Sequence, residues 1–253
     1  MNTTELKAFL DEKVAQYNHP RFIESDPISI AHNFTKKEDI EIAGFFAATL
    51  AWGQRVTIIK NAQRLVDFMD QAPHDFILNH APQDRQKMEG FVHRTFNFQD
   101  LLFFLEALQN LYRHQKGLEG AFTDGKPASA REALEQFRAK FFETPHLARS
   151  QKHVSNPAKN SSCKRLNMFL RWMVRQDTQG VDFGLWTGLK PAQLSCPLDV
   201  HSGNVARKLG LLKRSYNDWK AVQELDASLR ALDPNDPVKY DFALFGLGVF
   251  ERF

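Results

Sequence analysis

Asp199 is the side chain whose position most strongly suggests chemistry. It lies in PLDVHSGNVARKLGL, residues 197–211, where one carboxylate precedes the first turn of a basic helical run. An acid at this point is a good helix N-cap and is well placed for the helix dipole. The same carboxylate can also serve as a reacting group, and one residue can do both. His201 is expected to make a structural hydrogen bond rather than to act as a base.

The chain around Asp199 is strongly basic. Residues 151–220 hold twelve Lys or Arg against four acids, a net charge of +8, whereas the rest of the chain carries −5. Residues 151–175 hold six basic residues and no acid. Segregation on this scale favours a polyanionic partner, and nucleic acid is the first choice. A solvated face without a partner is the plainer interpretation.

The elements that must position these side chains are predicted to be helical. With 253 residues and 43% hydrophobic residues, the chain is long enough for one large domain or two small ones. Helical periodicity runs through most of it, and no stretch shows strand alternation, so the protein is predicted to be all-α. Thr35 and Glu38 predict a capping-box start, and 114–130 reads as a polar linker. Helices are expected at 4–17, 38–52, 55–71, 73–80, 84–89, 98–113, 131–143, 164–175, 200–210, 216–232 and 240–253.

The sequence predicts no membrane span, no disulfide and no metal. No stretch approaches the ~18 apolar residues that cross a bilayer, and MNTTELKAFLDEKVAQY does not read as a signal peptide, so we expect a cytoplasmic protein. Cys163 and Cys196 cannot build a disulfide framework or a four-cysteine cluster. His153 and His201 alone are a weak basis for a metal site.

Three separated stretches resemble the helix-hairpin-helix DNA glycosylase superfamily, which includes endonuclease III and the archaeal 8-oxoguanine glycosylases. PLDVHSGNVARKLGL is similar to its P-[VL]-D-[TV]-H-x-x-R-V-x-x-R-L signature. GFFAATLAWGQRVTIIKNAQRL, residues 44–65, is similar to its early helix–turn–helix, and YDFALFGLG, residues 240–248, to its late helix. The whole chain also resembles an uncharacterised bacterial family without an established activity.

The resemblance implies a two-lobed, helix-hairpin-helix glycosylase-like fold and a catalytic pair. One lobe would span approximately 35–145, and the other 1–34 and 146–253 with the active-site loop. Asp199 matches the catalytic aspartate, and Lys164, which opens KRLNMFLRWMVR, matches the lysine of lyase-type members. Basic neighbours favour the neutral amine of Lys164, which can attack the sugar C1′ after a flipped base is expelled. Asp199 would stabilise the charge on the deoxyribose or help to deprotonate the amine. A solvated, phosphate-contacting lysine is the alternative.

The sequence departs from the superfamily pattern in its hairpin. The usual L-P-G-[VI]-G is replaced by NPAKNSSCKRL, which has neither glycine, and the 35-residue spacing from Lys164 to Asp199 is longer than in endonuclease III. The iron–sulfur cysteines are also absent, so no cluster or other cofactor is expected. For the tryptophans, a place in the core is at least as good an interpretation as stacking. The residues expected to bind DNA or stack on a base are Trp52, Gln54, Arg55, Lys159, Ser161, Ser162, Arg165, Arg171, Trp172, Trp186, His201, Asn204 and Arg207.

These features together predict a DNA repair glycosylase. It would excise a damaged base from double-stranded DNA, with or without AP lyase activity, as a monomer and without a membrane partner. One alternative is a catalytically silent nucleic-acid binder on the same fold. Another is a helical scaffold whose basic surface binds an acidic protein. The sequence does not specify the lesion, because pocket selectivity depends on a few side chains whose directions it does not give.

Overall fold

The computed structural model describes residues 2–253, and most of them are helical. The prediction of a helical protein is confirmed. Two short strands, β1 (Val92–His93) and β2 (Phe96–Asn97), form one antiparallel hairpin that the sequence pattern did not indicate. The chain divides into two compact units, each described separately below. Unit 1 comprises residues 1–22, 128–132 and 155–253, and unit 2 comprises residues 23–127 and 133–154.

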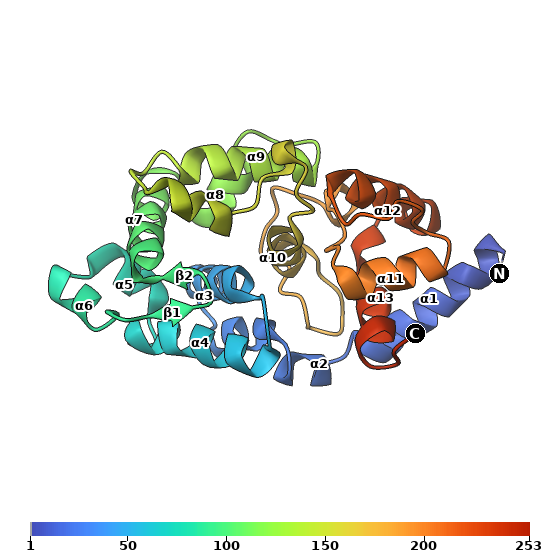
Figure 1. Cartoon of the computed structure of the whole chain (residues 1–253), viewed down its shortest axis with the longest axis horizontal. Coiled ribbons are helices and arrows are strands. Elements are labelled where there is room, and N and C mark those ends of the chain that lie inside the picture. The colour runs from blue at the N-terminus through green and yellow to red at the C-terminus, as the bar shows by residue number, and fades with distance from the viewer. Residues whose placement is uncertain (1) are drawn as a thin grey trace. The chain divides into compact units, whose positions relative to one another are not determined.

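Unit 1 contains the C-terminal helices together with the first helix of the chain. Its long helices are α1 (Thr3–Tyr17), α10 (Lys164–Val174), α11 (Val200–Lys208), α12 (Trp219–Leu232) and α13 (Tyr240–Val249). Short 3-10 segments, η3 (Pro157–Lys159), η4 (Pro191–Gln193) and η5 (Pro237–Lys239), each begin at a proline, whose fixed φ suits a first turn. Figure 1 shows that α1 and α13, from opposite ends of the chain, lie side by side.

Helix α13 is the centre of unit 1, because it packs against both α1 and α11. Two glycines permit this close approach. A Cβ on Gly246 would lie 2.1 Å from the ring of Tyr17 on α1, and one on Gly248 would lie 3.1 Å from the backbone oxygen of His201 on α11. Helix α11, whose N-cap is Asp199, therefore packs against α13, and α13 is itself held in place by α1.

Helix α10 is buried along nearly its whole length. Phe169, Leu170, Trp172 and Met173 are inaccessible to solvent, although the sequence of this helix is one of the most basic in the chain. Its first residue, Lys164, stays partly exposed. Because the rest of α10 is buried, the position of Lys164 at its partly exposed first turn is fixed.

Unit 2 is built around phenylalanine side chains. Its core rings, Phe45, Phe104 and Phe141, lie with centroids 5.0–5.9 Å apart, within the range that favours aromatic pairs. They come from three different helices. The elements of unit 2 are η1 (Pro27–Asn33), α3 (Lys37–Leu50), α4 (Arg55–Phe68), α5 (Pro73–Asn79), α6 (Pro82–Gln86), the hairpin, α7 (Phe98–His114), α8 (Gly117–Thr123) and η2 (Ala148–His153).

Two short or shared helices complete the structure. Helix α9 (Ala130–Phe141) begins in unit 1 and continues in unit 2, and α2 (Arg21–Glu24) also crosses the division. The sequence placed residues 23–34 and 146–154 in the lobe that carries Asp199, whereas in the structure they belong to unit 2.

Two local expectations are corrected. Helix α3 is capped by Lys36 without a side-chain bond, so the predicted Thr35–Glu38 capping box was wrong. The supposed linker 114–130 contains α8, all of whose residues except Glu119 are buried. Apolar packing of Leu118, Ala121 and Phe122 stabilises this helix despite its polar, glycine-bounded sequence.

Candidate functional site

The site begins at the loop that leads into α10. The turn is made by two residues other than glycine in the left-handed region, Asn160 at φ 61° and Cys163 at φ 50°. Cys163 is the N-cap of α10 and offers no side-chain cap to the helix. The loop therefore reaches a tight turn without the two glycines that the sequence lacks, and Asn accepts this conformation more readily than most residues.

Asp199 is the N-cap of α11. Its Oδ1 accepts a hydrogen bond from the Ser202 backbone N–H at 3.0 Å, and the Ser202 hydroxyl accepts one from the Asp199 N–H at 3.0 Å. This reciprocal arrangement is a capping box in which Ser202 takes the place usually held by Glu. One oxygen of the carboxylate is thus occupied by the helix, and the other remains for another partner.

That second oxygen faces Lys164. Lys164 Nζ lies 3.3 Å from Asp199 Oδ2, and the two side chains are 28% and 21% exposed. Burial alone would raise the pKa of Asp199, but the ammonium of Lys164 and the hydrogen bond from Ser202 outweigh it and lower that pKa below its ordinary value. The two residues that the sequence proposed as a catalytic pair therefore form a partly accessible ion pair, with Asp199 held as the carboxylate at neutral pH.

A relay of hydrogen bonds supports the backbone at Asp199. Asn217 Nδ2 donates to the Asp199 carbonyl at 2.8 Å, and Arg207 donates to Asn217 Oδ1 at 2.6 Å and to the Arg214 carbonyl at 2.8 Å. Gly203 makes room for them, since a Cβ there would lie 2.7 Å from Asn217 Oδ1. Arg207 was expected to bind DNA, and the structure engages its half-buried guanidinium within unit 1 as a support for the Asp199 turn.

Arg171 and Arg175 also lie inside the unit. Each is 3% exposed. Arg171 donates to Asp182 at 3.2 Å and to Asp241, whereas Arg175 donates to Asp182 at 3.1 Å and to Asp236 at 2.9 Å. Burial raises the pKa of Asp241 to about 6, although Arg171 acts to lower it. These two of the six bases in 151–175 compensate buried acids and do not face solvent, where a phosphate would bind.

Two of the tryptophans expected to stack on a base are core residues of unit 1. Trp172 is inaccessible, and Trp186 is 2% exposed with its ring edge-to-face against Phe169 at 5.4 Å. Trp172 belongs to the apolar stripe of α10, and the ring of Trp186 packs against that stripe at Phe169. In this arrangement neither indole has a face that an incoming base can reach.

Trp52, Gln54 and Arg55 belong to unit 2, so the structure describes them separately from the Lys164–Asp199 pair. Trp52 is half-buried, with its ring stacked on His153 at 6.4 Å and the guanidinium of Arg94 5.4 Å from its centre. Gln54 is exposed and is the N-cap of α4, and Arg55 is the first residue of that helix. This corner of unit 2 thus presents a cation, a partly open indole and an exposed amide.

The remaining expected contacts lie at the surface or at its edge in unit 1. Lys159, His201 and Asn204 are exposed, whereas Ser161, Ser162 and Arg165 are half-buried. Across residues 2–253, no grouping of His, Cys, Asp and Glu is able to hold a metal ion. The sequence reasoning missed Ser202 and Asn217; the Asp-x-x-Ser spacing pointed to the first, and no sequence signal pointed to the second.

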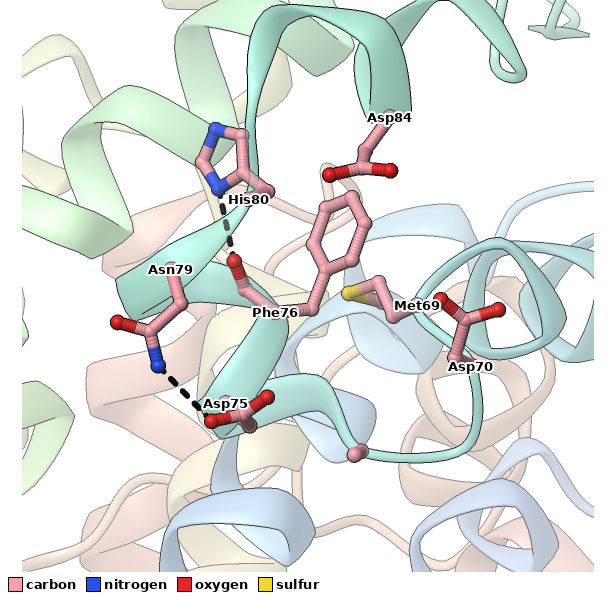
Figure 2. Close-up of a pocket in the computed structure, with 8 residues that line it drawn as sticks. Met69, Asp70, Asp75, Phe76, Asn79, His80 and Asp84 are labelled. Carbon is pink, nitrogen blue, oxygen red and sulfur yellow. Dashed lines mark hydrogen bonds between the residues drawn. The ribbon is translucent and has the colours of Figure 1, made fainter.

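Unit 2 has a small acidic pocket of about 140 Å³. In Figure 2 the ring of Phe76 and the sulfur of Met69 lie between the carboxylates of Asp70 and Asp84, while His80 donates to the Phe76 carbonyl. Ligand pockets for drug-sized molecules are larger, roughly 300–1,000 Å³. Its size and its negative lining make this pocket unsuited to a nucleotide, and we do not assign the function to it.

The fold and the site define a helical protein of two compact units, with an ion-paired lysine and aspartate at the starts of two helices. No helix in residues 2–253 combines the length and the apolar content that a membrane span needs. Residues 26–250 match the model of a family described as "Protein of unknown function (DUF2400)", and the chain belongs to that family. No curated protein and no solved structure matches it.

Proposed function

We propose that this protein is a DNA repair glycosylase with lyase activity, built on a helix-hairpin-helix type of fold. One observation carries the proposal: the 3.3 Å contact between Lys164 Nζ and Asp199 Oδ2, which joins two residues 35 positions apart at a partly open site. An amine beside a carboxylate is the minimum that base excision through a Schiff base requires.

The proposed reaction uses both members of the pair. The C1′–N bond of a flipped, damaged nucleotide breaks with its electron pair on the base, and Asp199 stabilises the positive charge left on the sugar. The ammonium of Lys164 gives a proton to the departing base. The freed amine forms the C1′–Nζ bond, and Asp199 accepts one of the two protons then left on Nζ. The C1′–O4′ bond then opens, Asp199 returns that proton to O4′, and the nitrogen keeps the other proton in the protonated Schiff base.

The low pKa of Asp199 fits the first of these roles. A carboxylate that stays charged at neutral pH is able to stabilise an adjacent cation, and Lys164 Nζ lies 3.3 Å from its Oδ2, on the side where the flipped nucleotide is proposed to bind. The capping box keeps the other carboxylate oxygen fixed, so Oδ2 does not have to be reoriented during the reaction.

Borohydride trapping tests the proposal. Duplexes that contain an abasic site, 8-oxoguanine or an alkylated base are incubated with the wild type, Lys164→Ala and Lys208→Ala, the last as an exposed control on α11. We expect a covalent adduct with the wild type and with Lys208→Ala but not with Lys164→Ala. Release of a base without an adduct would indicate a monofunctional glycosylase that relies on Asp199. Neither adduct nor base release on any duplex contradicts the proposed chemistry.

A nucleic-acid binder without turnover is the second candidate. It is favoured by the engagement of Lys164 in an ion pair and by the unusual turn at Asn160 and Cys163. In that case the pair only joins α10 to α11. Salt-sensitive duplex binding that survives in Lys164→Ala, with no chemistry in the wild type, distinguishes this candidate from the enzyme.

A further inference from the structure

Two loops of unit 1 are joined next to the candidate site. The first is the turn before α10, residues 156–163, and the second is the loop 213–218 between α11 and α12. Ser161 and Asp218 form an isolated antiparallel bridge, the Trp219 N–H donates to the Asn160 carbonyl at 3.1 Å, and Asn160 Nδ2 donates to Asp218 at 3.0 Å. The two loops therefore form one continuous surface.

Tyr216 projects from this surface. It is 72% exposed, more than any other large apolar side chain described for unit 1. The guanidinium of Arg214 lies 5.9 Å from its ring, and Arg214 is itself held by two bonds to Asp218 at 2.7 and 2.5 Å. Exposing a large aromatic ring to water brings no stability by itself, and on a loop that is otherwise well bonded this ring is held where a ligand can reach it.

The charges beside Tyr216 are unbalanced. Lys159 and Lys213 are exposed, and neither makes an ion pair within the described part of the chain. The nearby acids are already engaged. Asp218 is bound by Arg214 and Asn160, and Glu224 accepts hydrogen bonds from the backbone N–H groups of 213 and 214 at 2.6 and 3.3 Å. The surface is thus positive around an exposed aromatic ring.

This surface is connected to the Lys164–Asp199 pair by one residue. Asn217 follows Tyr216 directly and donates to the Asp199 carbonyl at 2.8 Å. The loop 156–163 ends at the residue before Lys164. The two loops are therefore connected to the pair through two separate chain segments, one by the hydrogen bond to the Asp199 carbonyl and the other by the backbone of Lys164.

We propose that Tyr216 stacks on an unpaired nucleobase of the DNA strand engaged at the candidate site, while Lys159 and Lys213 bind the phosphates on either side. This inference rests on the proposed function and names a contact that a base-excision mechanism does not itself require. An exposed aromatic ring flanked by cations is the combination that holds single-stranded nucleic acid, since every base offers a π-face. An acidic protein would need the lysines alone.

The test separates stacking from charge. A labelled oligothymidine and a duplex with one unpaired base are titrated by fluorescence anisotropy at several salt concentrations. The proteins are wild type, Tyr216→Ala, Tyr216→Phe, Lys213→Ala and the control Phe250→Ala, an exposed aromatic at the end of α13. We expect Tyr216→Ala to weaken binding about 5- to 150-fold with an unchanged salt slope, and Tyr216→Phe to bind like the wild type. Lys213→Ala should reduce the magnitude of the slope by about 0.7 on the single strand.

Equal binding by wild type and Tyr216→Ala overturns the inference, and so does an equal loss in Phe250→Ala. Borohydride trapping on an abasic duplex keeps this result apart from the fate of the proposed function. Trapping that is indifferent to Tyr216→Ala, with binding also unchanged, removes the stacking surface and leaves the enzyme. Binding that depends on Tyr216 without any trapping removes the enzyme and leaves the surface.

Discussion

Asp199 serves the helix and the site with different oxygen atoms. Oδ1 caps α11 and Oδ2 meets Lys164, so the two interpretations of this residue can be separated by substitution. Asp199→Asn keeps an oxygen for the Ser202 N–H, whereas Asp199→Ala removes it. We expect Asp199→Ala to lower the free energy of unfolding by about 1 kcal/mol, and Asp199→Asn to lower it less. Urea unfolding of both variants at neutral pH measures this difference.

The pH dependence supplies the control for that comparison. The pKa of Asp199 is lowered in the folded protein, so the stabilisation by its charge is present above the ordinary value of 3.8 and is lost as the pH falls through the lower folded value. The deficit of Asp199→Asn should therefore shrink in acid. A deficit that is constant from neutral to acid pH would mean that the Lys164–Asp199 pair does not stabilise the fold.

For Asp226 we expect the opposite pH dependence of stability. It is buried, its Oδ1 accepts from the Cys196 N–H at 2.9 Å, and burial raises its pKa to about 6. The folded protein holds the proton more tightly than the unfolded chain, so stability falls as the pH rises from about 3.8 to about 6. Asp226→Asn keeps the acceptor and avoids the buried charge.

We therefore expect Asp226→Asn to be more stable than wild type at pH above 7, by up to about 3 kcal/mol, and equal to it at pH below 4. Denaturant unfolding of both proteins across this pH range measures the change. The Arg230 guanidinium, 3.8 Å from the carboxylate, acts to lower the pKa of Asp226 but does not outweigh the effect of burial. A variant that is less stable than wild type above pH 7 would show that this pair outweighs the cost of burial.

At the scale of elements, the sequence predicted most helices because their apolar faces repeat with the helical period. It failed at α8, where the periodic signal is too short and two glycines and several polar residues resemble a linker. It also failed at the start of α3, because the Thr35–Glu38 spacing permits a capping box without requiring one. Tertiary packing decides both places, and a single sequence does not show packing.

Some helices pack closely only because one of them carries a glycine at the contact, and the sequence alone does not show which glycines have this role. Gly246 on α13 faces Tyr17 on α1, and a Cβ there would lie 2.1–2.4 Å from three atoms of the ring. Alanine is the better helix former, by about 1 kcal/mol. We nevertheless expect Gly246→Ala to destabilise unit 1 by about 1–3 kcal/mol, because overpacking pushes α1 away from α13.

A double-mutant cycle with Tyr17→Ala checks the cause. If the ring is the obstacle, Gly246→Ala should cost much less, or even stabilise the protein, once Tyr17 has been truncated. Thermal unfolding of the four proteins measures the coupling. An equal cost of Gly246→Ala in both backgrounds would place the clash elsewhere.

At the scale of the whole molecule, the charge asymmetry in the sequence overstates how many basic side chains of residues 151–220 are available at the surface. Arg171, Arg175 and Arg207 contribute to the charge of 151–220, yet all three are engaged inside unit 1. A single sequence cannot distinguish them from Lys159 or Lys213. Asp241 and Asp236, which bind Arg171 and Arg175, lie far along the chain. Arg207 is bound by an amide oxygen and a backbone carbonyl, which a charge pattern does not show. The pairing of Lys164 with Asp199 was anticipated only through the family resemblance. No sequence pattern singled out Tyr216 as a candidate binding residue.

The chain crosses repeatedly between the two units, so we expect their unfolding to be coupled. The chain passes between them four times, and α9 runs through the division without a break. Both cysteines, Cys163 and Cys196, are buried in unit 1, and burial raises the pKa of the Cys196 thiol well above its ordinary value. The thiols should therefore be inert in the native protein and report the opening of unit 1 alone.

Because α9 joins the two units, we expect unit 1 not to open before the rest of the chain. Thiol labelling along a urea series should give the same midpoint as far-UV circular dichroism, which reports the helices of both units. A Cys163→Ala variant tests whether either thiol alone gives that midpoint. Labelling that precedes the loss of helix would mean that unit 1 unfolds independently, and that the continuity of α9 does not couple the two units.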